Sequence, residues 1–293
     1  MRRLPRQSGK LLGLLGAGVG ADLKWRDVHP RYRTYFDKQL QAVVTTDLSE
    51  WGGRSCYYWG RYYDVVHQAL LRRILRLGDT YIDIGANLGF HSLFARKLIG
   101  PGGTLVSFEP HPRTFALLSA HFAINRIWGT HLFNLALGSE PGTATLHQPE
   151  EHSGTSTLRE CATSVFSVSV PVETGDRVLE KVPFTGRVVV KIDVEGLESA
   201  VLRGIEKTLE RVSMVAMEVT PGWLIRQGGS VEELYRYMAG LGFRPIVPSI
   251  SWKLGLFPGE LRFLPAEQVE EWQYDVCFVR DSLAAEANLV VTA

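Results

Sequence analysis

Short apolar runs alternate along the chain with longer segments of helical spacing. The runs are bounded by turn residues and lie at 80–84, 104–108, 131–137, 187–192 and 214–218. Uniformly apolar runs of this length are typical of strands buried on both faces. The helical segments lie at 64–77, 90–99, 112–126 and 231–241, and Gly78 and Gly100 end the first two. This alternation predicts an α/β fold with a mostly parallel, Rossmann-like sheet.

The alternation changes in the middle and near the C-terminus of the chain. Strand-like runs at 143–147 and 164–172 have only turn-like sequence between them, which predicts a β-excursion. Further strands are expected at 243–247 and 276–280. Residues 25–63 hold ten aromatic residues, and we expect them to form a lid over the core or, for some rings, to line a substrate cleft.

Charge and cysteine content narrow the function classes. The net charge of +1 over 293 residues shows no general affinity for nucleic acid, although residues 1–40 carry nine Lys/Arg and only three Asp/Glu. Cys56, Cys161 and Cys277 are far apart and form no metal-binding motif, so reduced thiols in the cytoplasm are expected.

The first 22 residues place four basic residues before an apolar, glycine-rich stretch. This order resembles a signal peptide, but the eleven residues from Leu11 to Ala21 are too few to span a bilayer, which takes about 20. We therefore predict no transmembrane segment. A flexible arm is the expected structure, with weak contact to a membrane surface as a further role.

The run at 80–84 leads into the motif Asp83-Ile-Gly-Ala-Asn-Leu-Gly89. Glycines at a helix start allow an anionic ligand to approach the backbone. The motif differs from the dinucleotide fingerprint G-x-G-x-x-G, because Asn87 stands where the second glycine would be. Glu109, at the end of the next strand, can accept both hydroxyls of a ribose. The pattern therefore favours a nucleoside without a pyrophosphate, and S-adenosylmethionine is the common ligand of that description.

Four carboxylates lie at or next to the ends of predicted strands: Asp83, Glu109, Asp193 and Glu218. Ligands of such sheets bind beyond the carboxyl ends of the strands, so these acids predict a cleft. Asp193, Glu195 and Glu198 also have a purely structural interpretation, since acids in the first turn of a helix stabilise it through the macrodipole.

The motif at 83–89, Phe108-Glu-Pro110 and Val190-Lys-Ile-Asp-Val-Glu-Gly-Leu-Glu198 together resemble the signature of FkbM-type methyltransferases over residues 45–250. The resemblance implies a seven-stranded class I methyltransferase sheet with an antiparallel last strand. Beyond the resemblance, we expect an N-terminal arm and aromatic-rich lid segment over 1–63, a methyltransferase domain over 64–282 and a C-terminal tail over 283–293. The cofactor implied is S-adenosylmethionine.

The resemblance also implies roles for ten cofactor-binding residues. The cofactor would lie over Gly85, Ala86, Asn87 and Gly89, with its ribose on Glu109 beside Pro110. Asp83 and His91 would lie near the methionine portion. Ala136 and Leu137 would face the adenine.

A hydroxyl acceptor must lose its proton during methyl transfer, so a base in reach accelerates the reaction. Asp193 is the first candidate and Glu195 the second, while Lys191 either pairs with a carboxylate or reaches the cleft. His111 and His152 are further candidates from facing loops. A divalent cation between Asp193 and Glu195 is an alternative use of these acids, but without histidine-rich ligands we predict no metal site.

The sequence thus predicts an O-methyltransferase for a small hydroxyl compound, such as a sugar or a secondary-metabolite alcohol. Three alternatives remain: a nicotinamide-dependent oxidoreductase, a nucleic-acid methyltransferase, and a non-catalytic nucleoside-binding protein.

Overall fold

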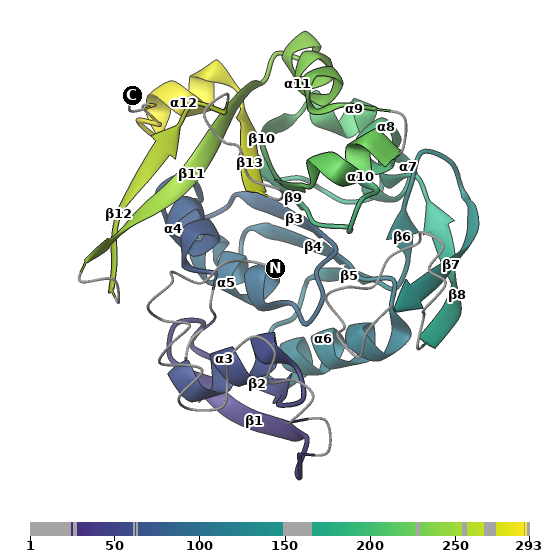
Figure 1. Cartoon of the computed structure of the whole chain (residues 1–293), viewed down its shortest axis with the longest axis vertical. Helices are drawn as coiled ribbons and strands as arrows, with labels where there is room; N and C mark the ends of the chain where they lie inside the picture. Colours follow the sequence, from purple (N-terminus) through teal and green to yellow (C-terminus); the bar gives the residue numbers. More distant parts are fainter. Residues whose placement is uncertain are drawn as a thin grey trace.

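The computed structural model describes residues 25, 28–60, 62, 64–148, 166–226, 229–253, 257–266, 274–289 and 291. Its centre is a sheet in the order β12-β11-β13-β10-β9-β3-β4-β5 (Figure 1). The strands are β3 (Thr80–Ile84), β4 (Thr104–Phe108), β5 (His131–Phe133), β9 (Val188–Ile192), β10 (Val212–Val219), β11 (Arg244–Lys253), β12 (Phe257–Leu264) and β13 (Tyr274–Val279).

The strand directions confirm the predicted fold class. Strands β5, β4, β3, β9 and β10 pair in parallel, and β13 pairs antiparallel with both β10 and β11. The sheet has eight strands where seven were predicted. The run at 243–247 extends into the longer β11, and the chain then turns back as β12, which was not predicted. On β12, Phe263 also forms a parallel bridge with Val291.

Helices cover both faces of this sheet, which explains why its central strands β3, β4 and β9 are buried along their whole length. One face packs against α4 (Val65–Ile74), α5 (Phe90–Ile99), α6 (Pro112–Ile124) and α12 (Asp281–Glu286). The other packs against α7 (Gly175–Leu179), α8 (Glu198–Gly204), α9 (Glu206–Leu209), α10 (Pro221–Arg226) and α11 (Val231–Gly240). Along β3, Tyr81 enters the first core, and Ile82 and Ile84 enter the second.

The predicted β-excursion forms a separate sheet in the order β6-β8-β7, seen beside α7 in Figure 1. Its strands are β6 (Ala136–Leu137), β7 (Gly142–Gln148) and β8 (Phe166–Glu173). The single strand predicted at 131–137 was wrong, because the chain leaves the central sheet at Asn134. The side-chain amide of Asn134 donates to the backbone carbonyls of Glu109 (2.8 Å) and Pro110 (3.0 Å). These hydrogen bonds hold the chain where it leaves the central sheet.

The N-terminal part of the described chain is the hairpin of β1 (Tyr32–Asp37) and β2 (Ala42–Asp47), followed by α3 (Trp51–Trp59). Strand β2 lies against α6, where the Val43 amide donates to Asn125 (2.7 Å) and the Thr45 amide to His121 (2.8 Å). This places the hairpin on the α6 side of the sheet (Figure 1).

Other predictions have mixed outcomes. Helix α4 ends earlier than expected, with Leu75 as its C-cap, and Gly78 lies in the following turn. Leu283 and Ala284 of the segment predicted as a tail are buried in α12. The predicted arm at 1–22, His152 and Cys161 lie outside the described residues. In the described part of the chain no helix has the length and apolarity to cross a membrane.

Candidate active site

The turn between β3 and α5 packs tightly against the end of β9. Gly85 and Gly89 have φ values of +80° and +79°, and Asn87 also has a positive φ of +51°. A Cβ atom on Gly85 would lie 1.9 Å from the carbonyl oxygen of Asp193. Glycine is therefore required at position 85 both for the backbone conformation and for the close approach to β9.

Several backbone N–H groups of this turn are engaged within the protein. Those of Gly85 and Ala86 donate to the Phe108 carbonyl (3.0 and 2.9 Å), and that of Gly89 donates to the Ala86 carbonyl (2.9 Å). These hydrogen bonds hold the turn against the end of β4. The approach of an anionic ligand to the start of α5 stays a prediction.

Glu109 lies at the end of β4 and is almost fully buried. Its two carboxylate oxygens accept the amide hydrogens of Asn87 and His111, each at 2.8 Å. Burial raises the pKa of Glu109 to about 7, against the opposing effect of these two hydrogen bonds. Each oxygen retains a lone pair, so the carboxylate can still accept two neighbouring hydroxyls.

A pocket opens around Glu109, which we call the Glu109 pocket. Eight of the predicted site residues line it: Gly85, Asn87, Glu109, Pro110, Ala136, Leu137, Asp193 and Glu195. The other lining residues are apolar: Ile84, Phe108, Leu135, Leu146, Val194 and Leu197. Leu146 comes from β7 of the excursion, and no motif in the sequence connects it with the turn at 85–89.

Lys191 connects the strands on which the predicted acids lie. Its Nζ is 3.6 Å from Oδ1 of the fully buried Asp83 and 3.3 Å from Oδ2 of Asp193. The second oxygen of Asp83 accepts the hydroxyl of Ser92 at 2.5 Å. Lys191 was expected either to pair with a carboxylate or to reach the cleft, and the structure shows the pairing with carboxylates. Asp83 lies beneath the site and does not line the Glu109 pocket.

Two predicted histidines have mainly structural contacts. His91 is buried, with Nε2 3.2 Å from Asp64 Oδ2 and 3.2 Å from the Tyr62 hydroxyl, and it does not line the Glu109 pocket. His111 is the N-cap of α6, where its Nδ1 accepts the amide hydrogens of Arg113 (3.2 Å) and Thr114 (3.4 Å). Two other predicted cofactor-binding residues, Ala86 and Gly89, likewise do not line the Glu109 pocket.

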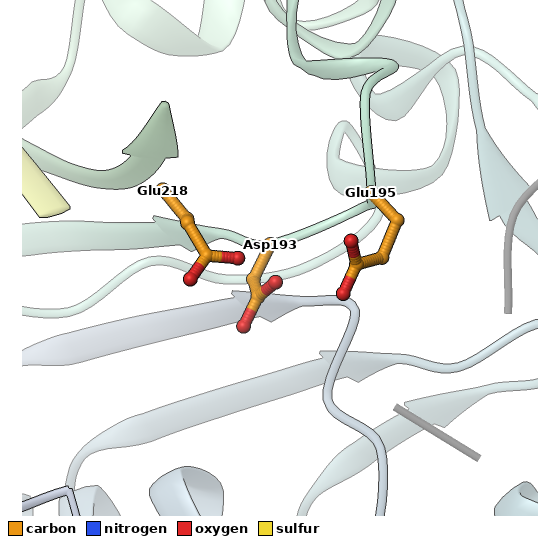
Figure 2. Close-up of side chains that lie close together, drawn as sticks. All are labelled: Asp193, Glu195 and Glu218. Carbon is orange, nitrogen blue, oxygen red and sulfur yellow. The ribbon is translucent and has the colours of Figure 1, made fainter. Parts of the chain in front are cut away.

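Three carboxylates gather near the C-terminal ends of β9 and β10. Ligand oxygens of Asp193, Glu195 and Glu218 all lie within 4.8 Å of one another, and Figure 2 shows the three side chains converging. A group of carboxylates of this kind can act as a base, and it could also hold a divalent cation. The nearby Glu198 has a structural role, because its buried carboxylate accepts the Gly196 amide hydrogen at 2.9 Å.

The Glu109 pocket fits the nucleoside cofactor that the sequence predicted. A buried carboxylate with two spare lone pairs suits a ribose diol, and the apolar side chains of Leu135, Ala136 and Leu137 suit a flat base.

Comparison with known proteins gives matching results. The model of the methyltransferase FkbM domain matches residues 83–245, more than half of the chain. The chain is similar to 31-O-demethyl-FK506 methyltransferase FkbM of Streptomyces tacrolimicus, with 29% identity over 58% of this chain and 74% of that protein.

Two further relatives match shorter stretches. Hexuronic acid methyltransferase AglP of Haloferax volcanii is 29% identical over 49% of this chain. Methyltransferase 1 of Beauveria bassiana is 28% identical over 44%. The matches span only 57% and 59% of the lengths of these two relatives.

Proposed function

Because the chain belongs to the FkbM methyltransferase family, we propose that it transfers a methyl group to a hydroxyl oxygen of a small molecule, such as a sugar or another alcohol. The observation that carries the proposal is the position of Asp193. Its side chain lines the Glu109 pocket and also belongs to the group of three carboxylates. A proton acceptor thus lies beside the expected place of the cofactor.

The methyl donor is S-adenosylmethionine, the cofactor of this family. When bound, it supplies a methyl group already activated by a positively charged sulfur. We assign the ribose to Glu109 and the adenine to the pocket wall formed by Leu135, Ala136 and Leu137. The support for this assignment is the buried, partly satisfied carboxylate next to an apolar wall.

In the proposed reaction the acceptor hydroxyl gives its proton to the carboxylate of Asp193. The acceptor oxygen then forms the bond to the methyl carbon, while the bond from that carbon to sulfur breaks and its electron pair stays on sulfur. Lys191, 3.3 Å from Asp193, positions the carboxylate. A positioned base of this kind contributes about 10²–10⁴-fold to the rate.

Glu195 is the second candidate for the base, because it lies within the same group of acids. Glu218, which the sequence indicated only as a strand-end acid, joins them in the structure (Figure 2). The prediction that no metal ion takes part stays a prediction. Treatment with a chelator distinguishes a carboxylate base from a bound cation. If the acids act as a base, the methyl-transfer rate stays the same without a cation. If they hold a metal ion, the rate falls until the cation is restored.

The proposed function is tested with the full chain by calorimetry and by an acceptor screen. We expect S-adenosylhomocysteine, the product of methyl transfer, to bind at micromolar to millimolar concentration. We also expect S-adenosylhomocysteine to form from S-adenosylmethionine when a suitable hydroxyl compound from a panel is added. If neither S-adenosylmethionine nor S-adenosylhomocysteine binds at millimolar concentration, the proposal is wrong.

The family match speaks against the nicotinamide-dependent oxidoreductase and the non-catalytic binding protein. A nucleic-acid acceptor would need a basic surface, and the basic residues 2–24 lie outside the described part of the chain. The acids around Asp193 favour a small uncharged acceptor over a polyanion. Retained RNA binding after deletion of residues 1–40 would exclude a role for the arm in such binding.

A further inference from the structure

Charged side chains are distributed unevenly over the surface of the fold. Residues 31–139 contain seven Asp/Glu, and six of them are buried: Asp37, Asp47, Asp64, Asp79, Asp83 and Glu109. The seventh, Glu50, is partly buried. Seven Lys/Arg of the same stretch are exposed: Lys38, Arg72, Arg73, Arg76, Lys97, Arg113 and Arg126. The described part of this stretch therefore presents cations to the solvent without a fully exposed carboxylate.

The hairpin of β1 and β2 and the helices α4, α5 and α6 lie on the same side of the central sheet (Figure 1). On this side, Nζ of Lys97 on α5 lies 3.4 Å from the backbone carbonyl oxygen of Gln39, which follows Lys38 in the turn of the hairpin. Partial desolvation and the charge of Arg72 on α4 lower the pKa of Lys97. Cations from α4, α5 and the hairpin are thus neighbours.

The end of α6 joins this surface through β2. The side chain of Asn125 exchanges two hydrogen bonds with the backbone of Val43, each 2.7 Å long. Ile124 and Arg126 are the chain neighbours of Asn125, and Phe36 on β1 is in register with Val43. We call the exposed residues of this surface the basic face: Phe36, Lys38, Arg72, Lys97, Ile124 and Arg126.

Large apolar side chains are exposed in the same part of the molecule. Of the eight that are exposed among the described residues, seven lie between positions 32 and 128: Tyr32, Phe36, Tyr58, Trp59, Leu77, Ile124 and Trp128. Cations mixed with exposed apolar side chains suit the surface of an anionic membrane, where the cations meet headgroups and the apolar groups enter the acyl boundary. A nucleic acid would pair with the cations and stack on the aromatic rings, but it would leave the aliphatic Leu77 and Ile124 in water.

The N-terminal sequence reaches the fold beside this surface. The ring of Trp25 lies 6.0 Å from that of Tyr58 on α3 and 5.6 Å from the guanidinium carbon of Arg54, and α3 packs against β2. The 24 residues before Trp25 place four basic residues before the apolar stretch from Leu11 to Ala21. They therefore have the same combination of positive charge and apolar side chains as the basic face.

We propose that the basic face docks on a membrane surface that contains anionic phospholipids, with its four cations on the headgroups and with Phe36 and Ile124 in the acyl boundary. The N-terminal sequence provides a second contact with the same surface. This inference goes beyond the proposed function, because docking needs neither cofactor nor acceptor. It also goes beyond contact by the arm alone, because a docked folded domain has a fixed orientation on the membrane.

Vesicle flotation of the full chain tests the proposal. Vesicles of phosphatidylcholine are compared with vesicles in which about 30% of the lipid is phosphatidylglycerol. In about 0.1 M NaCl the chain should bind the anionic vesicles about tenfold more tightly than the neutral ones, and the difference should shrink in about 0.5 M NaCl because salt screens the charges.

The triple variant Lys38→Gln, Lys97→Gln and Arg126→Gln tests the cations of the basic face. Each cation near an anionic surface contributes about fivefold, so the three changes together should weaken binding about 100-fold. The matched control also removes three exposed cations, by Arg203→Gln, Lys207→Gln and Arg236→Gln on α8, α9 and α11 of the opposite side. It should bind like the wild type. Thermal unfolding of both triple variants checks that they are folded.

The double variant Phe36→Ser and Ile124→Ser tests the apolar contribution. It should weaken the binding that remains in about 0.5 M NaCl by about tenfold, because this part of the affinity comes from buried apolar surface. A fluorescent single-stranded RNA serves as a second probe with the same proteins. We expect the anionic vesicles to compete with it, and the double variant to bind the RNA like the wild type.

The outcomes are distinct. If the chain does not prefer anionic vesicles, the inference is wrong. If the triple variant of the basic face binds the vesicles like the wild type, the arm alone makes the contact and the inference is also wrong. If RNA binds and the double variant leaves vesicle binding unchanged, the basic face is a nucleic-acid surface instead. Vesicle binding without any binding of S-adenosylhomocysteine would refute the proposed function and support this inference.

Discussion

The Glu109 pocket and a smaller cavity beside α4, which we call the α4 cavity, both include Asp193 in their walls and are built in different ways. The Glu109 pocket depends on backbone geometry, with three positive φ values between residues 85 and 89 and amide hydrogens held by Glu109 and Phe108. The α4 cavity depends on charged side chains from α4, β9, β10 and β13. The first arrangement is rigid and suits one constant cofactor, whereas the second can be changed side chain by side chain.

This difference explains which parts of the site could be predicted from the sequence. The turn at 85–89 and Glu109 are encoded within 25 residues, and the strand before each of them is a short, mainly apolar run. Asp275 is a single acid in a strand that pairs with β10 from far along the chain. Nothing in its local sequence distinguishes Asp275 from a surface acid, so its position in the wall of the α4 cavity was not predicted.

The fold shows the same division. Strands buried on both faces gave uniformly apolar runs that were recognised, as at 80–84 and 104–108. Strand β1 alternates exposed and half-buried residues and strand β2 contains two threonines, so neither gives an apolar run, and their hairpin was not predicted. Strand β12 includes Pro258, Gly259 and charged residues, which are typical of an edge strand and weaken the sequence signal.

The largest expected effect falls on the residue that the two cavities share. Asp193→Asn should lower turnover about 10²–10⁴-fold, because the amide cannot accept the acceptor's proton, while S-adenosylhomocysteine affinity changes only a few-fold. Initial rates with an acceptor from the panel, together with calorimetry, measure the two effects. Asp281→Asn, on an exposed acid, is the control.

Turnover of the Asp193→Asn variant equal to that of the wild type would move the base to another residue. The wild type should also keep its rate after treatment with a chelator. A rate that falls and returns with added Mg²⁺ would instead assign the three carboxylates to a cation.

Gly85→Ala tests the tight packing of the turn at 85–89 in the Glu109 pocket. The added methyl group would meet the Asp193 carbonyl oxygen, and the positive φ adds strain, so we expect a loss of about 2–4 kcal/mol in the free energy of unfolding. Urea unfolding followed by tryptophan fluorescence measures the change. Gly102→Ala is the matched control, since its Cβ would meet no neighbouring atom. Equal stability of the two variants would contradict the close packing of the turn on β9.

Glu109→Ala should weaken S-adenosylhomocysteine binding by about 1–3 kcal/mol, because the ribose hydroxyls lose their acceptors. Calorimetry with S-adenosylhomocysteine provides the measurement, and the exposed Glu140→Ala serves as control. Affinity that is unaffected by the loss of Glu109 would remove this residue from the cofactor site.

The smallest expected effect concerns pH. Since burial raises the pKa of Glu109 to about 7, the carboxylate that accepts the ribose hydroxyls forms only as the pH rises through that value. S-adenosylhomocysteine should therefore bind up to about tenfold more tightly at pH 8 than at pH 6. In Glu109→Gln this pH dependence should be absent; if it persists, another group causes it.

The same carboxyl should affect the stability of the ligand-free protein in the opposite direction. Its pKa in the folded state lies above the ordinary value of 4.5, so between about pH 4.5 and 7 the folded chain holds a proton that the unfolded chain has released. The contribution of Glu109 to the free energy of unfolding thus falls as the pH rises through this range. Unfolding of wild type and Glu109→Gln at several pH values isolates that contribution.

The bridge between Phe263 and Val291 has a consequence for solubility. Strand β12 is the last strand of the central sheet, and an open strand edge can pair with another molecule. Where Val291 pairs with Phe263, part of that edge is already covered. Removal of residues 290–293 would uncover it, so a shortened chain should self-associate more readily at high concentration while its catalytic residues remain intact.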